Sequence, residues 1–189
     1  IEAALATKYC KYPYDAYGGK ENFQGEVCHG GYDPAACNAN PNRMLPVDVM
    51  VELEQEGVIG EFYDYTYVTT GNGILNKNAL AFAKAISQDL LEHHVDGVLL
   101  TSAWGTCTRC GATLVKEIDK AGIPAVHICT VTPISESVGV NRIVPAVAIP
   151  HPLGDPELTP EAEKALRKAK VRLALEALAT PLTGQRIFD

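Results

Sequence analysis

Short apolar runs alternate with amphipathic helical stripes through the second half of this 189-residue chain, and this alternation is the strongest constraint on its fold. Residues 97–101 and 124–130 are continuous apolar stretches, as in strands buried at the centre of a parallel sheet. Between them, residues 107–121 carry apolar side chains at helical spacing and stop at Gly122. This order predicts an α/β fold, a three-layer sandwich with a mostly parallel sheet, Rossmann-like or flavodoxin-like.

Further segments continue the pattern on both sides. We expect helices at residues 46–56, at 78–93 and from Thr159 onward, and strands at 62–70 and 144–149. Residues 1–44 are rich in Gly, Pro, Tyr and Asn without sustained periodicity, which predicts a loop-rich N-terminal segment. The length favours a single domain over residues 1–189.

Charge and cysteine usage exclude several classes of function. The formal net charge of −7 argues against nucleic acid as a partner, because phosphate binding needs clustered Lys and Arg. No apolar run is long enough for a membrane span, and no export signal is recognisable. The six cysteines include one close pair, so we expect reduced thiols and a cytoplasmic location.

Residues 101–111 join a predicted strand to a predicted helix and contain the close pair, Cys107 and Cys110. A helix N-terminus favours thiolate over thiol, so Cys107 is a candidate nucleophile and Cys110 a resolving thiol. Half a zinc site is the alternative, but no second ligand pair follows, and we expect no metal. Trp104 occupies the turn where many α/β enzymes carry a nucleophile, although an aromatic rim of a pocket would look the same.

Six polar residues in predicted loops are candidates for substrate binding. His29 and Asp33 flank a glycine pair and could bind ligands or transfer protons, although a lone histidine is more often structural. Arg43 and Arg142 could each bind a carboxylate through two hydrogen bonds. Asn72 and His151 are polar residues that directly follow predicted strands. Each of these is weak evidence alone.

Several longer strings carry a resemblance to a known family. They are residues 29–34, 40–43 with 45–48, 105–113, 115–118, 129–131, 133–135, 141–145 and 148–154. Together they resemble the selenoprotein subunit of component B of the glycine, sarcosine and betaine reductases. Members are usually longer, so the resemblance implies that this chain is the C-terminal part of such a subunit.

The resemblance implies a selenocysteine at position 104, where this chain has Trp104. It further implies that a selenolate attacks the α-carbon of a small amino-acid substrate and leaves a Se-carboxymethyl group. The small selenoprotein of component A would receive that group, with acetyl phosphate formed downstream. A pyruvoyl group is expected on partner subunits of component B, and no cofactor on this chain itself. Cys107 would form a selenenyl-sulfide with the nucleophile, and Cys110 would be a second-line thiol.

Three alternatives stay open at this point. A D-proline reductase-type subunit has a similar pattern but lacks the second cysteine. A thiol-disulfide carrier would use Cys107 and Cys110 without a small substrate. A non-catalytic scaffold would carry a natural Trp104, and with tryptophan there the selenium step should be inactive. Glycine, sarcosine and betaine remain alternative substrates.

Overall fold

The centre of the main sheet is β4 (Ala125–Cys129), whose five residues are all buried. The structure is a computed structural model that describes residues 6–70 and 73–189. In it, β4 pairs in parallel with β3 (Val98–Ser102) on one side and β5 (Arg142–Pro145) on the other. A two-residue strand, β6 (Arg186–Ile187), continues the sheet beyond β5, so the order is β3-β4-β5-β6. The predicted parallel α/β architecture is confirmed.

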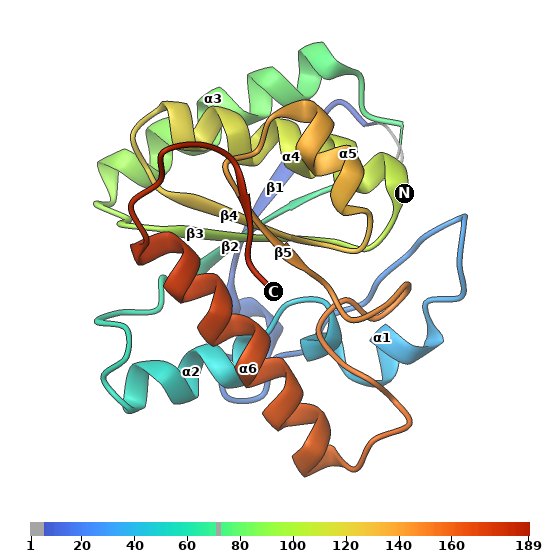
Figure 1. The fold of residues 1–189 in the computed structure, drawn as a ribbon. Helices are drawn as coiled ribbons and strands as arrows, with labels where there is room; N and C mark the ends of the chain where they lie inside the picture. The colour runs from blue at the N-terminus through green and yellow to red at the C-terminus, as the bar shows by residue number, and fades with distance from the viewer. Residues whose placement is uncertain (1–5, 71–72) are drawn as a thin grey trace.

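Helices cover both faces of this sheet, as Figure 1 shows. On one face lie α3 (Asn76–Glu92), α4 (Gly105–Lys120) and α5 (Thr132–Val138); on the other lies α6 (Pro160–Ala179), with α2 (Val47–Gln55) beside it. Thr159 caps α6 by accepting a hydrogen bond from the Ala162 amide, and Pro160 follows at the first helical position. Two buried clusters form the core between helices and sheet. One lies beneath α3 and α4, the other beneath α6.

The N-terminal region forms a second, smaller layer of structure. It contains β1 (Tyr9–Pro13), the 3-10 turns η2 (Tyr14–Tyr17) and η3 (Pro41–Arg43), and the short helix α1 (Ala35–Ala39). β1 pairs antiparallel with β2 (Tyr65–Thr69) in a separate two-stranded sheet. The strand predicted at residues 62–70 therefore exists, but it is shorter and is not hydrogen-bonded to the main sheet.

Other boundaries also differ from the predicted ones. The predicted strand at 144–149 begins at Arg142 and ends at Pro145, because the following residues turn toward the prolines at 150 and 152. Helix α4 begins at Gly105, two residues earlier than predicted, since Trp104 already has the extended backbone of an N-cap. Helix α5 and strand β6 were not predicted; α5 is short, with Pro133 in its first turn and left-handed Gly139 at its end.

Gly111 lets α4 approach the sheet closely. A Cβ atom there would lie 2.5 Å from Ser102 Oγ, 2.7 Å from Leu100 Cδ2 and 2.8 Å from His127 Nε2. We expect Gly111→Ala to lower the free energy of unfolding by about 1–3 kcal/mol, because overpacking forces this core apart. Urea unfolding followed by circular dichroism measures the loss. Gly60→Ala is the matched control, because nothing lies within 4 Å of its added carbon. Equal midpoints for the two variants would contradict the close approach.

Candidate functional site

The turn between β3 and α4 places Trp104 at the carboxyl edge of the main sheet. Its backbone is extended, with φ −143° and ψ 163°, and its carbonyl accepts a hydrogen bond from the Thr108 amide at 2.7 Å. Trp104 is therefore the N-cap of α4. Its side chain makes no cap hydrogen bond and remains 37% exposed. An N-cap side chain faces the positive end of the helix dipole, which favours an anion, whereas the indole ring carries no charge.

A distant segment packs an aromatic cluster around this turn. The rings of His29 and Tyr32 are stacked, with centroids 4.1 Å apart and planes 13° apart. Trp104 lies against both of them, at 5.9 Å from His29 and 6.0 Å from Tyr32. The glycines between the two aromatic residues allow this folding back, and the Gly31 amide donates to His29 Nδ1 at 2.9 Å. The predicted His-Gly-Gly-Tyr-Asp motif thus reaches position 104 through His29 and Tyr32.

His29 also faces the first cysteine of the CxxC motif. Its Nε2 lies 3.6 Å from Cys107 Sγ. Because Nδ1 accepts the Gly31 amide proton, the proton of the neutral ring is on Nε2, which is therefore the donor to sulfur. Burial lowers the pKa of His29, so the ring is neutral at physiological pH. The site pairs a neutral imidazole N–H with a sulfur atom one helical turn from position 104.

The two cysteines differ from the predicted reactive pair. Burial raises the pKa of the Cys107 thiol and outweighs the hydrogen bonds that lower it. Cys110 has no exposed surface, and burial raises its pKa to about 11. All six cysteines are free thiols, and each lies in the described part of the chain. The expectation that the helix terminus makes Cys107 a thiolate is therefore wrong, because burial has the larger effect.

Beneath the turn lies a buried polar network that we did not predict. His127 of β4 is completely buried, and its two nitrogens lie 2.9 Å from Ser102 Oγ and 2.9 Å from Ser135 Oγ. Ser102 donates its proton to the Cys107 carbonyl at 3.3 Å, so it accepts from His127 Nε2–H. Burial lowers the pKa of His127 to about 3, which keeps the ring neutral. A histidine inside an otherwise apolar strand was the available sequence signal.

Asp33 and Arg43, two of the residues predicted to bind substrate, instead form hydrogen bonds or ion pairs within the protein. Asp33 caps its own turn, because its Oδ1 accepts from the Ala35 amide at 3.0 Å. Arg43 forms an ion pair with Glu163 at 2.5 Å and donates to the Ala36 carbonyl at 2.7 Å. The guanidinium of Arg43 thus already has buried protein partners.

The described contacts of Arg142 and His151 are with residues other than Trp104. Arg142 starts β5 at the opposite ends of the strands, where it binds Asp119 at 3.0 Å and the Ala177 carbonyl at 2.8 Å. His151 Nδ1 lies 2.7 Å from the Gly154 carbonyl. Asn72 is outside the described residues. Substrate-binding roles for these five residues stay predictions, while His29, Cys107 and Trp104 are the candidates that meet in space.

The donor role of His29 gives a test of this geometry. We expect His29→Phe to raise the pKa of Cys107 further, since a hydrogen bond to sulfur favours the thiolate. Alkylation of Cys107 by iodoacetamide, followed by peptide mass spectrometry across pH, should be slower in the variant and shifted to higher pH. Replacement by Gln supplies an N–H donor and is the control that should recover part of the rate. An unchanged pH profile in His29→Phe would contradict the contact.

Two further findings concern the residues that the structure describes. Among residues 6–70 and 73–189, no group of three or more His, Cys, Asp or Glu side chains is arranged to hold a metal ion. In the same ranges, none of the helices combines the length and apolar character that a bilayer crossing needs.

The fold and the site define an α/β protein with its candidate site at a strand-to-helix turn, on the carboxyl edge of a parallel sheet. This is the usual place of ligand sites in such sheets. The chain belongs to the glycine/sarcosine/betaine reductase selenoprotein B family, whose model matches residues 1–103.

Curated relatives match the whole chain. A glycine reductase complex component B subunit gamma from Symbiobacterium thermophilum is 57% identical over 189 residues, which are 100% of this chain and 44% of that protein. Two proteins of Peptoclostridium acidaminophilum, a sarcosine and a betaine reductase complex component B subunit beta, are 49% and 44% identical. Each match covers 100% of this chain and 43% of the relative. The chain thus spans less than half the length of these relatives. No solved structure matches it.

Proposed function

We propose that this chain is part of the substrate-processing subunit of a glycine, sarcosine or betaine reductase, and that position 104 is its nucleophile position. The observation that carries the proposal is the N-cap geometry of Trp104, at a place that favours an anionic side chain. Family membership supports a selenocysteine there. Glycine is our first choice of substrate, because identity to the glycine reductase subunit is 57%, against 49% and 44% for the other two.

In the proposed reaction, a selenolate at position 104 attacks the α-carbon of the substrate. A carbon–selenium bond forms while the carbon–nitrogen bond breaks, and the amine leaves with the bonding electron pair. The dipole of α4 stabilises the selenolate before attack. A pyruvoyl group on a partner subunit is expected to hold the amino group of glycine, and the small selenoprotein of component A to receive the carboxymethyl group. The six free thiols are in keeping with a reducing cytoplasm.

The neighbouring residues have different roles in this proposal. Cys107 lies one turn along α4. If a peroxide oxidised the selenolate to a selenenic acid, the Cys107 thiol would displace water from selenium and form a selenenyl-sulfide, which two further thiols would reduce back to the selenolate and the free Cys107 thiol. His29 would orient Cys107 by donating its Nε2–H to sulfur. Cys110 is fully buried, which argues against a dithiol carrier that uses both cysteines in solution. With Trp104 in place, the chain carries no nucleophile at the N-cap and is inactive in the selenium step.

Two measurements test the proposal. The codon for residue 104 in the native gene should be TGA, and a TGG codon would overturn the selenocysteine assignment. In addition, a component B complex that carries selenocysteine at 104 should gain a carboxymethyl adduct on the peptide around that position when given glycine. Sarcosine and betaine are the comparison substrates. An adduct on Cys107 alone would favour thiol chemistry instead.

A further inference from the structure

Strands β2 and β3 run in the same direction, although they are not hydrogen-bonded to each other. The end of β2 reaches the first turns of α4, where Thr69 hydrogen-bonds the Cys110 side chain. The end of β3 reaches the same turns, through the hydrogen bond from Ser102 to the Cys107 carbonyl. Helix α3 joins the two strands. Parallel strands joined by a helix normally belong to one sheet, yet here they belong to two.

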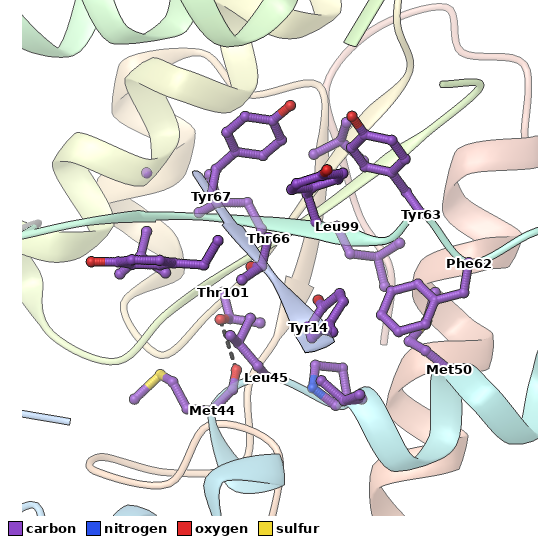
Figure 2. Close-up of a pocket in the computed structure, with 18 of the residues that line it drawn as sticks. Tyr14, Met44, Leu45, Met50, Phe62, Tyr63, Thr66, Tyr67, Leu99 and Thr101 are labelled. Atoms are coloured by element: carbon purple, nitrogen blue, oxygen red, sulfur yellow. Dashed lines mark hydrogen bonds between the residues drawn. The ribbon is translucent and has the colours of Figure 1, made fainter. Parts of the chain in front are cut away.

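A cavity of about 1370 Å³ lies between the two strands. It is lined by every residue from 65 to 70 and every residue from 95 to 103. Since successive side chains of a strand point to opposite faces, a wall made by one face would use alternate residues only. Consecutive lining residues show that strand edges form the two walls. Figure 2 shows Thr66 and Tyr67 of β2 and Leu99 and Thr101 of β3 around this space.

Both edges have free pairing capacity among the described residues. β1 pairs with β2 on one side only, and β3 is the end strand of the main sheet. The Val98 amide donates to the Pro124 carbonyl at 2.9 Å, and the Ser102 carbonyl accepts from Thr130 at 3.3 Å, both on the β4 side. Along a strand, successive residues direct their backbone N–H and C=O groups to opposite sides. Since Val98 and Ser102 face β4, Leu99 and Thr101 direct these groups toward the cavity.

The cavity is larger than a simple substrate pocket. Small-molecule sites are typically about 300–1,000 Å³, and a single small amino acid would leave this space largely unfilled. Backbone N–H and C=O groups at a strand edge are also strong hydrogen-bonding groups that pair readily with another strand. An extended peptide segment would fill this volume, and its two edges would hydrogen-bond to β2 on one side and to β3 on the other.

We propose that the space between β2 and β3 receives one parallel β-strand, supplied by the part of the longer family chain that lies outside these 189 residues. The curated relatives support this source, because the matched region is 43–44% of their length. The inserted strand joins the two sheets into one, in the order β1-β2-inserted strand-β3-β4-β5-β6. Because parallel strands inside a sheet are buried on both faces, the segment should be a short apolar run rich in Val and Ile.

Hydrogen exchange in the full-length Symbiobacterium thermophilum relative tests the proposal. The amides equivalent to Leu99 and Thr101 should exchange about a hundredfold more slowly than unpaired edge amides, and as slowly as those of Leu100 and Ser102. The Leu100 and Ser102 amides are matched internal controls, because they face β4. In a chain limited to the 189 residues, the Leu99 and Thr101 amides should lose this protection, whereas those of Leu100 and Ser102 should keep it.

Three results would overturn the proposal. The first is fast exchange at the Leu99 and Thr101 equivalents in the full-length relative while their β4-facing neighbours remain protected. The second is protection that depends on protein concentration, which would assign the edge to a second copy. Protection that appears only after a separate component B subunit is added would likewise place the strand in a partner.

Discussion

The Trp104→Cys variant should become alkylated at position 104 by iodoacetate, at a rate at least about tenfold above that of Cys107 at pH 7. The introduced thiol would occupy the N-cap of α4, where the helix dipole lowers a thiol pKa. Burial raises the pKa of Cys107 and thereby lowers its thiolate fraction. Selenocysteine at the same position should react faster still, because a selenol is more acidic than a thiol. Tryptic peptide mass spectrometry separates the two positions.

The exposed thiol of Cys28 is the main source of background, so the comparison belongs in a Cys28→Ser chain. Trp104→Ser is the matched control, because it opens the same space without a nucleophile. If Cys107 reacts faster than the introduced cysteine, the helix terminus does not activate position 104. The carrier interpretation would then gain over the reductase proposal.

The Glu163→Ala variant should lose about 3–5 kcal/mol of unfolding free energy, the usual cost of breaking a buried ion pair from one side. Glu163 has 4% side-chain exposure, and its carboxylate accepts from Arg43 Nε at 2.5 Å and from Asn40 Nδ2 at 3.3 Å. Without it, the guanidinium of Arg43 keeps the Ala36 carbonyl but no counter-charge. Thermal and urea unfolding measure the loss.

Glu56→Ala is the control for this experiment. Glu56 also contacts two cations, Lys168 and Arg172, but its side chain is 37% exposed. Exposed ion pairs contribute about 0–1 kcal/mol, so the expected loss is small. Similar losses for the two glutamates would mean that Arg43 is not a buried structural residue. Its predicted role in substrate binding would then regain support.

The sequence allowed the main sheet to be predicted where periodicity and burial agree. The apolar run before Trp104 and the one after Gly122 are β3 and β4, which pair with each other in the parallel sheet. The pairing of β2 with β1 was missed, since β1 lies in a segment without clear periodicity. Strand β6 has two residues, too few for any periodic signal, and depends on tertiary contacts with β5.

For the site, the sequence allowed the residues to be predicted better than their burial and pKa values. The meeting of His29 with Trp104 and Cys107 joins segments about 75 residues apart in the chain, and the predicted candidates included all three. The pKa of Cys107 was predicted in the wrong direction, because desolvation depends on packing that a motif does not contain. Arg43 was misleading for the same reason, since its partner Glu163 lies on a distant helix.

Strand β6 also affects the order of events during synthesis. It pairs with Arg142 and Ile143, and the following Phe188, 4% exposed, completes the core cluster beneath α6. A ribosome therefore releases residues 142–179 before the residues that cover this edge and cluster. The nascent chain exposes an unpaired strand and apolar surface during that interval, the condition in which aggregation is most common. Chaperone binding during translation should accordingly be strongest after α6 has emerged and should fall once residue 188 is free.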